Sequence, residues 1–230
     1  MKTIGLLGGM SWQSTIEYYR LINERVSQRI GGLHSGKILM YSVDFGEIEQ
    51  LQRQNDWETA GKRLAAAAQA LEKAGADMML ICANTMHKVS DAVQQSIGIP
   101  LVHVADVTAE AIRKAGLRHV GLLGTRYTME QDFLKQRLSA HGLQVSVPGE
   151  NDRNDLHRII FEQLCKGIFL ESSKVRVIQI MESLAASGAE GVIWGCTEIS
   201  LLLRPEEAPL QVFDTTALHA GKAVELALEG

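Results

Sequence analysis

The chain has 230 residues, of which 46% are apolar and 22% are charged, and its formal net charge is −4. That length is enough for one large domain or two small ones, and the composition is that of an ordinary globular protein. A mildly acidic chain has no electrostatic reason to bind nucleic acid or an anionic membrane, so we expect a small-molecule ligand. Neither a membrane span nor a signal peptide is recognisable, and we expect a cytoplasmic protein.

Three cysteines occur in the chain, at positions 82, 165 and 196. Their number is odd, and none of them lies in the Cys-x-x-Cys pair that is typical of zinc and redox sites. A disulfide framework is therefore not expected, and reduced thiols in a reducing compartment are the natural interpretation.

Short apolar runs alternate with amphipathic segments along the first half of the chain. We predict helices over 14–30 and 57–74, the second ended by Gly75 as a glycine commonly ends a helix. The apolar runs predict strands at Thr3–Leu7, Lys37–Val43, Asp77–Cys82 and Pro100–Val104. Strands that alternate with helices indicate a parallel sheet covered by helices on both faces.

The second half of the chain then repeats the first. GLLG at 5–8 returns at 121–124, GAD at 75–77 returns as GAE at 188–190, and IPL at 99–101 returns as APL at 208–210. The shared order predicts an α/β protein made of two similar three-layer α/β/α half-domains. Each has a short parallel sheet, and the two are related by pseudo-twofold symmetry with the active site in the cleft between them. We expect domain limits at 1–104 plus 214–230 and at 105–213.

The repeat also serves as an internal alignment. Placing 75–77 on 188–190 without gaps sets Ala83 opposite Cys196, and residues 84–85 opposite 197–198. Both segments directly follow a predicted strand, where ligand-binding loops of open α/β sheets are found. Two such copies would present positions 83 and 196 to opposite faces of one bound molecule, which suits inversion at a carbon atom.

Four segments resemble the aspartate/glutamate racemase family, and the resemblance covers essentially the whole chain. They are GGMSW at 8–12, NT at 84–85, GT at 124–125 and GCTE at 195–198. The related glutamate racemases usually have Asp-Ser-Gly in place of residues 9–11 and His in place of Glu198, so the aspartate-racemase branch is favoured. The resemblance implies an amino-acid racemase without pyridoxal phosphate or metal, acting on a small amino acid as a homodimer.

The same resemblance implies two thiols that flank the α-carbon of the substrate. Cys196 is the second thiol, and the first should immediately precede Asn84, where this chain has Ala83. Cys82 stands one residue too early, and because side chains alternate along a strand, its thiol should point away from the cleft. We therefore interpret Cys82 as a buried structural cysteine rather than as the second catalytic base.

Hydroxyl and amide donors on the predicted loops are expected to hold the substrate α-carboxylate, where negative charge develops. Lys166, in a Lys-Gly pair that resembles the one in aspartate racemases, is expected to hold the side-chain carboxylate, with Gln52 or Arg53 serving from the other half. Glu198 is assigned to the substrate ammonium group. The candidate substrate-binding residues are Met10, Ser11, Gln52, Arg53, Asn84, Thr85, Thr125, Lys166, Thr197 and Glu198.

The alanine at position 83 leaves two alternatives open. A decarboxylase or other isomerase of the same superfamily could work with Cys196 alone, and an amino-acid-binding protein without catalysis would need no thiol. If the protein is a racemase, free enantiomers of equal energy exclude strictly one-way turnover. The Ala83 face would then depend on water or on a displaced Cys82 for its proton, and proton exchange with retention could be faster than inversion.

Overall fold

The computed structural model describes residues 1–229, and these residues fall into two compact units. The first unit contains Met1–His103 together with the chain from His219 onward, and the second contains Val104–Leu218. The second boundary falls inside the last helix, α11 (Thr215–Leu228), whose first turn belongs to the second unit.

The first unit has a parallel sheet in the order β2–β1–β3. Its strands are β1 (Ile4–Gly8), β2 (Ile38–Ser42) and β3 (Met78–Ile81). The strand expected at Pro100–Val104 was wrong, because only Leu101 pairs with the sheet, through one bridge to Met79. The chain turns away after two backbone hydrogen bonds there, and a helix begins at Val104.

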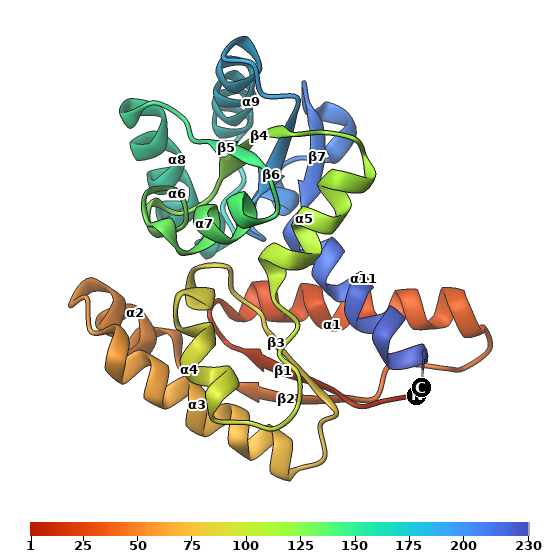
Figure 1. The fold of residues 1–230 in the computed structure, drawn as a ribbon. Helices are drawn as coiled ribbons and strands as arrows, with labels where there is room; N and C mark the ends of the chain where they lie inside the picture. The colour runs from red at the N-terminus through yellow and green to blue at the C-terminus, as the bar shows by residue number, and fades with distance from the viewer. Residues whose placement is uncertain (230) are drawn as a thin grey trace. The chain divides into compact units, whose positions relative to one another are not determined.

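Helices cover both faces of this sheet, as Figure 1 shows for α1 (Trp12–Ile30) on one face and α3 (Trp57–Lys73) on the other. Leu7, Met79 and Ile81 form one core with α2 (Phe45–Arg53), α3 and α4 (Ser90–Gln95). The alternate strand side chains are equally buried on the opposite face. This burial on both faces explains why β1 and β3 are continuously apolar rather than alternating.

The second unit has a four-stranded parallel sheet in the order β5–β4–β6–β7. Its strands are β4 (His119–Leu123), β5 (Gln144–Ser146), β6 (Gly191–Trp194) and β7 (Gln211–Asp214). β7 occupies the place that Leu101 takes with its single bridge in the first unit. The repeat predicted from the sequence is therefore present in the order of the strands.

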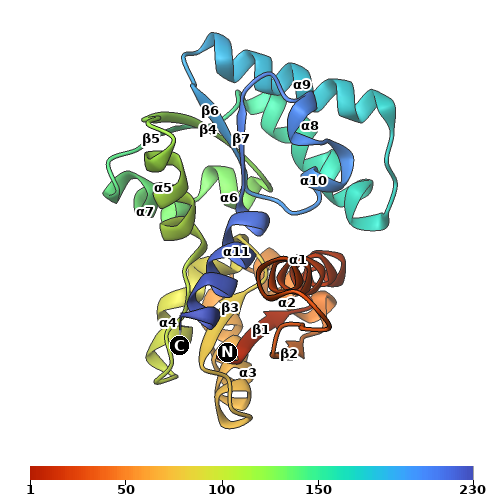
Figure 2. The same ribbon diagram turned by 90° about the vertical axis from the view of Figure 1, so that its right-hand side faces the viewer.

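Two cores sandwich this second sheet. On one face Leu123 and Trp194 pack against α8 (Glu150–Glu162), α9 (Glu171–Ala186) and α10 (Ile199–Leu202). On the other face Leu122 and Ile193 pack against α5 (Val104–Lys114) and α7 (Asp132–Ala140). Figure 2 shows α8 and α9 on one side of β4, β6 and β7, with α5 and α7 on the other.

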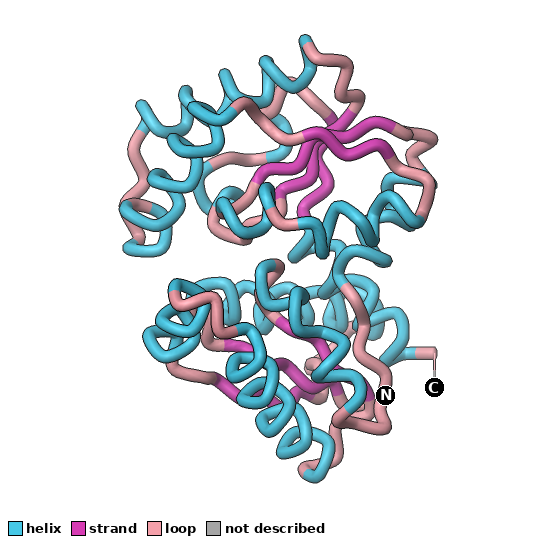
Figure 3. Tube along the Cα trace, turned by 60° about the vertical axis from the view of Figure 1, so that its left-hand side comes forward, coloured by secondary structure: helices cyan, strands magenta, loops and turns pink. Residues whose placement is uncertain are grey.

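Shorter elements complete the described chain. They are the helix α6 (Arg126–Glu130) and the 3-10 turns η1 (Thr85–Val89), η2 (Leu164–Lys166) and η3 (Pro205–Glu207). Figure 3 shows helices around the strands within each unit, so the expected α/β architecture of two helix-flanked parallel sheets is confirmed. Among residues 1–229, no helix has the length and apolar character required to span a membrane.

Candidate active site

Backbone hydrogen bonds place the two strand-ending loops in equivalent positions of their own units. The amide of Cys82 donates to the carbonyl of Leu7 at 2.9 Å, and the amide of Gly195 donates to the carbonyl of Leu123 at 2.7 Å. In each unit, this bond joins the residue after the strand to the last paired residue of the neighbouring strand. The next residue is an alanine in the first loop and Cys196 in the second.

The first loop contains no accessible thiol. Cys82 has no exposed surface, and this burial raises the pKa of its thiol well above the ordinary value. Ala83 is half-buried, Asn84 is buried, and Thr85 begins the turn η1. An uncharged amide and a hydroxyl are thus the polar side chains that directly follow position 83, and neither is a base of useful strength at neutral pH.

The loop after β1 is shaped by close backbone packing. Gly9 has a φ of +95°, and a Cβ atom there would lie 2.2 Å from the carbonyl oxygen of Val43. Ser11 caps α1, since its hydroxyl accepts a hydrogen bond from the amide of Ser14 at 3.4 Å. Met10 is buried in the first unit's core, so its side chain contributes to packing.

The structure distinguishes the neighbouring candidates Gln52 and Arg53. Gln52 is buried, and its Nε2 donates to the sulfur of Met86 at 3.0 Å, in the turn that follows Thr85. The side chain of Arg53 is 71% exposed and forms an ion pair of 2.6 Å with Glu49. Of the two, Gln52 is the residue that reaches the segment following β3.

A cluster of buried aromatic and imidazole rings supports the first loop, and no sequence pattern indicated it. His87 Nδ1 donates to the carbonyl of Ala83 at 3.0 Å, and its ring lies 4.6 Å from that of His103. His219 Nε2 donates to the carbonyl of Val102 at 2.7 Å, which leaves Nδ1 to accept from the hydroxyl of Tyr18 at 2.9 Å. Burial lowers the pKa of His219 to about 4, so this imidazole is neutral.

The second loop joins a thiol to a carboxylate. The Sγ atom of Cys196 donates to Oε2 of Glu198 at 2.9 Å, and the two residues are 8% and 4% exposed. Burial, followed by the negative charge of Glu198, raises the pKa of Cys196 well above its ordinary value. The resting pair is consequently a thiol that donates to a carboxylate, rather than a free thiolate.

A second thiol approaches the same carboxylate from a distant part of the sequence. Cys165 lies on η2, which packs against α10 directly after the Cys196 loop. Burial, followed by the charge of Glu198 and a hydrogen bond with it, raises the pKa of Cys165 to about 12. Sequence reasoning missed this residue, and its position beside Lys166 was the one signal that could have pointed to it.

The remaining candidates of the second unit have local partners. Thr125 caps α6, since its hydroxyl accepts from the amide of Thr128 at 3.3 Å. The hydroxyl of Thr197 lies 3.1 Å from that of Thr216. Lys166 is exposed and precedes Gly167, whose φ of +71° ends the turn η2 in a left-handed conformation.

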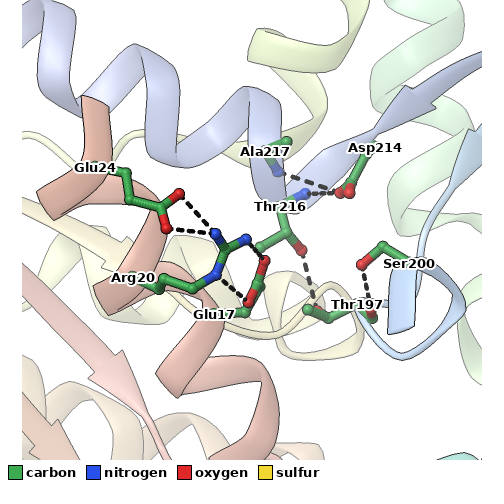
Figure 4. A network of polar contacts seen from close by, with 8 residues as sticks. All are labelled: Glu17, Arg20, Glu24, Thr197, Ser200, Asp214, Thr216 and Ala217. Carbon is green, nitrogen blue, oxygen red and sulfur yellow. Dashed lines mark hydrogen bonds and ion pairs between the residues drawn. The ribbon is translucent and has the colours of Figure 1, made fainter. Parts of the chain in front are cut away.

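Figure 4 shows the hydrogen bond between the hydroxyls of Thr197 and Thr216, and the capping of α11 that fixes the position of Thr216. One carboxylate oxygen of Asp214 accepts from the amides of Thr216 and Ala217, at 2.8 and 3.2 Å. The same picture shows Arg20 of α1 bound to two carboxylates of its own helix, Glu17 and Glu24. Within residues 1–229, no group of three or more His, Cys, Asp or Glu side chains is arranged to hold a metal ion.

Comparison with known proteins identifies the relatives of this chain. The family model described as Asp/Glu/Hydantoin racemase matches residues 7–223. A Yersinia pestis protein assigned as an Asp/Glu racemase is 52% identical, with a TM-score of 0.93 over 99% of this chain and 100% of that one. An aspartate racemase homologue from Pyrococcus horikoshii is 38% identical, with a TM-score of 0.88 over 99% of this chain and 100% of that one.

A further relative is a broad specificity amino-acid racemase of Bacillus subtilis, which is 21% identical over 96% of both chains. The family model spans nearly the entire chain, and the two solved structures cover it from end to end. The chain therefore belongs to the Asp/Glu/Hydantoin racemase family, a family of isomerases.

Proposed function

We propose that the protein is a cofactor-independent racemase of aspartate, glutamate or a related acidic amino acid, and that Cys196 carries the α-proton. The observation that carries this proposal is the 2.9 Å hydrogen bond from the Cys196 thiol to the Glu198 carboxylate, in a loop directly after a central strand. The relatives support the substrate class, because they are described as Asp/Glu and aspartate racemase proteins.

The proposed reaction begins with transfer of the Cys196 proton to Glu198. The S–H bond breaks, an O–H bond forms on the carboxylate, and the resulting thiolate removes the α-proton of the L-amino acid. The electron pair of the C–H bond is then delocalised into the substrate carboxylate. Because its pKa is raised, the Cys196 thiolate is a stronger base than an ordinary one, which favours proton removal once the anion has formed.

This scheme gives Glu198 the role of proton acceptor for the thiol, in place of the ammonium-binding role expected from the sequence. A carboxylate that already accepts the S–H proton in the resting state needs no movement to receive it. Its negative charge opposes a thiolate in the resting state, so the thiolate forms only when Glu198 takes up the proton and its charge is neutralised.

The opposite face of the α-carbon depends on a different proton source. The methyl group of Ala83 cannot donate a proton, and Cys82 is one residue away with a completely buried thiol. We propose that water delivers this proton: an O–H bond breaks, the C–H bond forms, and the hydroxide left behind is neutralised by the proton held on Glu198. Inversion would then be slower than exchange through Cys196.

The protonated state of Cys196 also favours a second candidate function. A decarboxylase that protonates a carbanion needs one acid, and a thiol whose pKa is raised remains protonated at neutral pH. A disubstituted malonate would be the substrate of such an enzyme. Release of carbon dioxide from it, without exchange of any amino-acid α-proton, would replace the racemase proposal with this one.

The test incubates the protein with L-aspartate or L-glutamate in deuterated water. NMR measures the loss of the α-proton signal, and chiral chromatography measures the ratio of the enantiomers. Deuterium entry with formation of D product supports a racemase. Cys196→Ala should abolish both signals while Cys82→Ala, the matched thiol control, retains them. Absence of exchange in the unmodified protein, with amino-acid binding intact, would contradict the proposal. The homodimer and the cytoplasmic location expected from the sequence remain predictions.

A further inference from the structure

We propose that Cys165 is a positioning residue whose thiol holds the Glu198 carboxylate in the orientation that accepts the proton of Cys196. This inference rests on the proposed role of the Cys196–Glu198 pair. Its test, however, reads the state of the Cys196 thiol without any substrate, so the two proposals can fail separately.

The geometry brings two distant segments to one carboxylate. Cys165 lies on η2, which contacts α10, and its side chain packs against the core cluster that contains Cys196 and Ile199. Glu198 precedes α10 and is 4% exposed, so its carboxylate is held within this part of the second unit. Oε2 accepts from Cys196, and the carboxylate also has a hydrogen bond with Cys165.

A buried carboxylate needs donors, because leaving it without hydrogen bonds has a large cost in free energy. Its two oxygens offer about four acceptor sites, and each cysteine provides a single weak donor. When Cys196 gives up its proton, its hydrogen bond to Glu198 reverses direction. The bond with Cys165 does not depend on that transfer and can hold the carboxylate in place throughout it.

Cys165 is a poor candidate for a base or a redox partner in its own right. Its pKa is raised to about 12 by burial and by the neighbouring carboxylate, and that of Cys196 is raised as well. A thiol with a pKa of about 12 stays protonated at neutral pH, so Cys165 keeps its S–H group. The chemical value of Cys165 at this place is therefore its S–H donor.

The experiment measures alkylation of Cys196 by iodoacetamide as a function of pH, with mass spectrometry to assign the modified cysteine. The titratable groups that act on Cys196 are Glu198, in its own loop, and Cys165, from η2. Cys165→Ala should loosen the carboxylate, weaken its hold on the Cys196 proton and lower the alkylation midpoint by about one pH unit. Cys165→Ser, which restores a donor, should return the midpoint to that of the unmodified protein.

Val147→Ala is the matched control, because Val147 is another half-buried side chain of the same core cluster. Equal shifts in Cys165→Ala and Val147→Ala would overturn the proposal, since loosened packing would then explain both. A serine variant that behaves like the alanine variant would overturn it as well.

A double-substitution test does not depend on the serine variant folding. In a Glu198→Gln background, Cys165→Ala should shift the Cys196 midpoint much less than it does in the unmodified protein, because the positioning role acts through the carboxylate and only the direct effect of Cys165 on Cys196 is left. A full shift in that background would overturn the proposal. Failure of α-proton exchange in the unmodified protein, with these midpoints behaving as expected, would instead sink the racemase proposal and leave the positioning role standing.

Discussion

The loops that follow β3 and β6 share their backbone anchorage, yet they differ in nearly every side chain that could act on a substrate. Cys82 and Gly195 make corresponding hydrogen bonds to the neighbouring central strand. The next position is an alanine in the first loop and Cys196 in the second, and a carboxylate follows in the second loop alone. Backbone pairing within a repeat constrains the path of the chain, while the side chains that point away from the sheet can diverge.

The positions directly before β3 and β6 have diverged much less, since each holds an acidic residue. Asp77 accepts a hydrogen bond from the amide of Thr3 at 2.6 Å, and Glu190 accepts from the amides of Arg118 and His119 at 2.9 and 2.8 Å. Each carboxylate belongs to a corresponding position and satisfies the free amides where the central strand of its unit begins. Because this task is structural in both units, both units have kept an acidic side chain for it.

The largest expected effect comes from Cys196, the position at which the two loops differ most in their chemistry. Cys196→Ala should reduce α-proton exchange by on the order of 1,000-fold, because the side chain that carries the proton is lost. Exchange is measured by NMR in deuterated water, with thermal unfolding as the folding control. Retained exchange in Cys196→Ala would mean that the chemical difference between the loops has no catalytic consequence.

A second prediction concerns the pH dependence of stability and rests on His219, a fully buried histidine of the first unit. Its pKa is about 4 in the folded protein against 6.5 for an unperturbed histidine, so the unfolded chain binds more protons between these values. The free energy of unfolding should therefore fall as the pH falls from 6.5 to 4, by up to about 3 kcal/mol in total.

Chemical denaturation at several pH values between 4 and 7.5 measures this loss, and His219→Gln supplies the comparison. Glutamine offers an amide donor for the carbonyl of Val102 but does not titrate, so the variant should lose less stability on acidification. Identical pH profiles for the two proteins would show that another group is responsible.

A third substitution tests the carboxylate that the first loop lacks. Glu198→Gln should slow α-proton exchange by about 100-fold, because the amide cannot take up the thiol proton. It should also lower the pKa of Cys196, since a negative charge beside the sulfur is removed. Exchange kinetics and iodoacetamide alkylation follow the two effects, and faster exchange in this variant would contradict the proton-acceptor role.

The smallest expected effect would make the two loops more alike. Ala83→Cys adds a thiol at the position opposite Cys196 in the repeat, and it should raise the rate of inversion relative to exchange by about tenfold. Chiral chromatography and NMR of the same samples yield this ratio. Ala83→Ser, whose hydroxyl is a far weaker base, is the matched control and should produce a smaller gain or none.

Much of the architecture was predictable because it depends on local pattern. The helix over 57–74 and its end at Gly75 follow from a helical composition and from a glycine whose φ is +100° in the structure. The strand expected at Pro100–Val104 was wrong, because an apolar run of five residues does not reveal whether a sheet offers it enough partners. In this segment Leu101 pairs with Met79 through a single isolated bridge, which is too little to form a strand.

The sequence by itself determined the repeat, the family resemblance and the inequality of Ala83 and Cys196, since these depend on residue identities at aligned positions. Only the tertiary structure decided that Cys165 shares a carboxylate with Cys196, or that Tyr18 bonds to a histidine 201 residues away. The reason is physical: packing of whole helices against a sheet sets the distances between residues that are far apart in the chain. No periodicity or spacing records those distances.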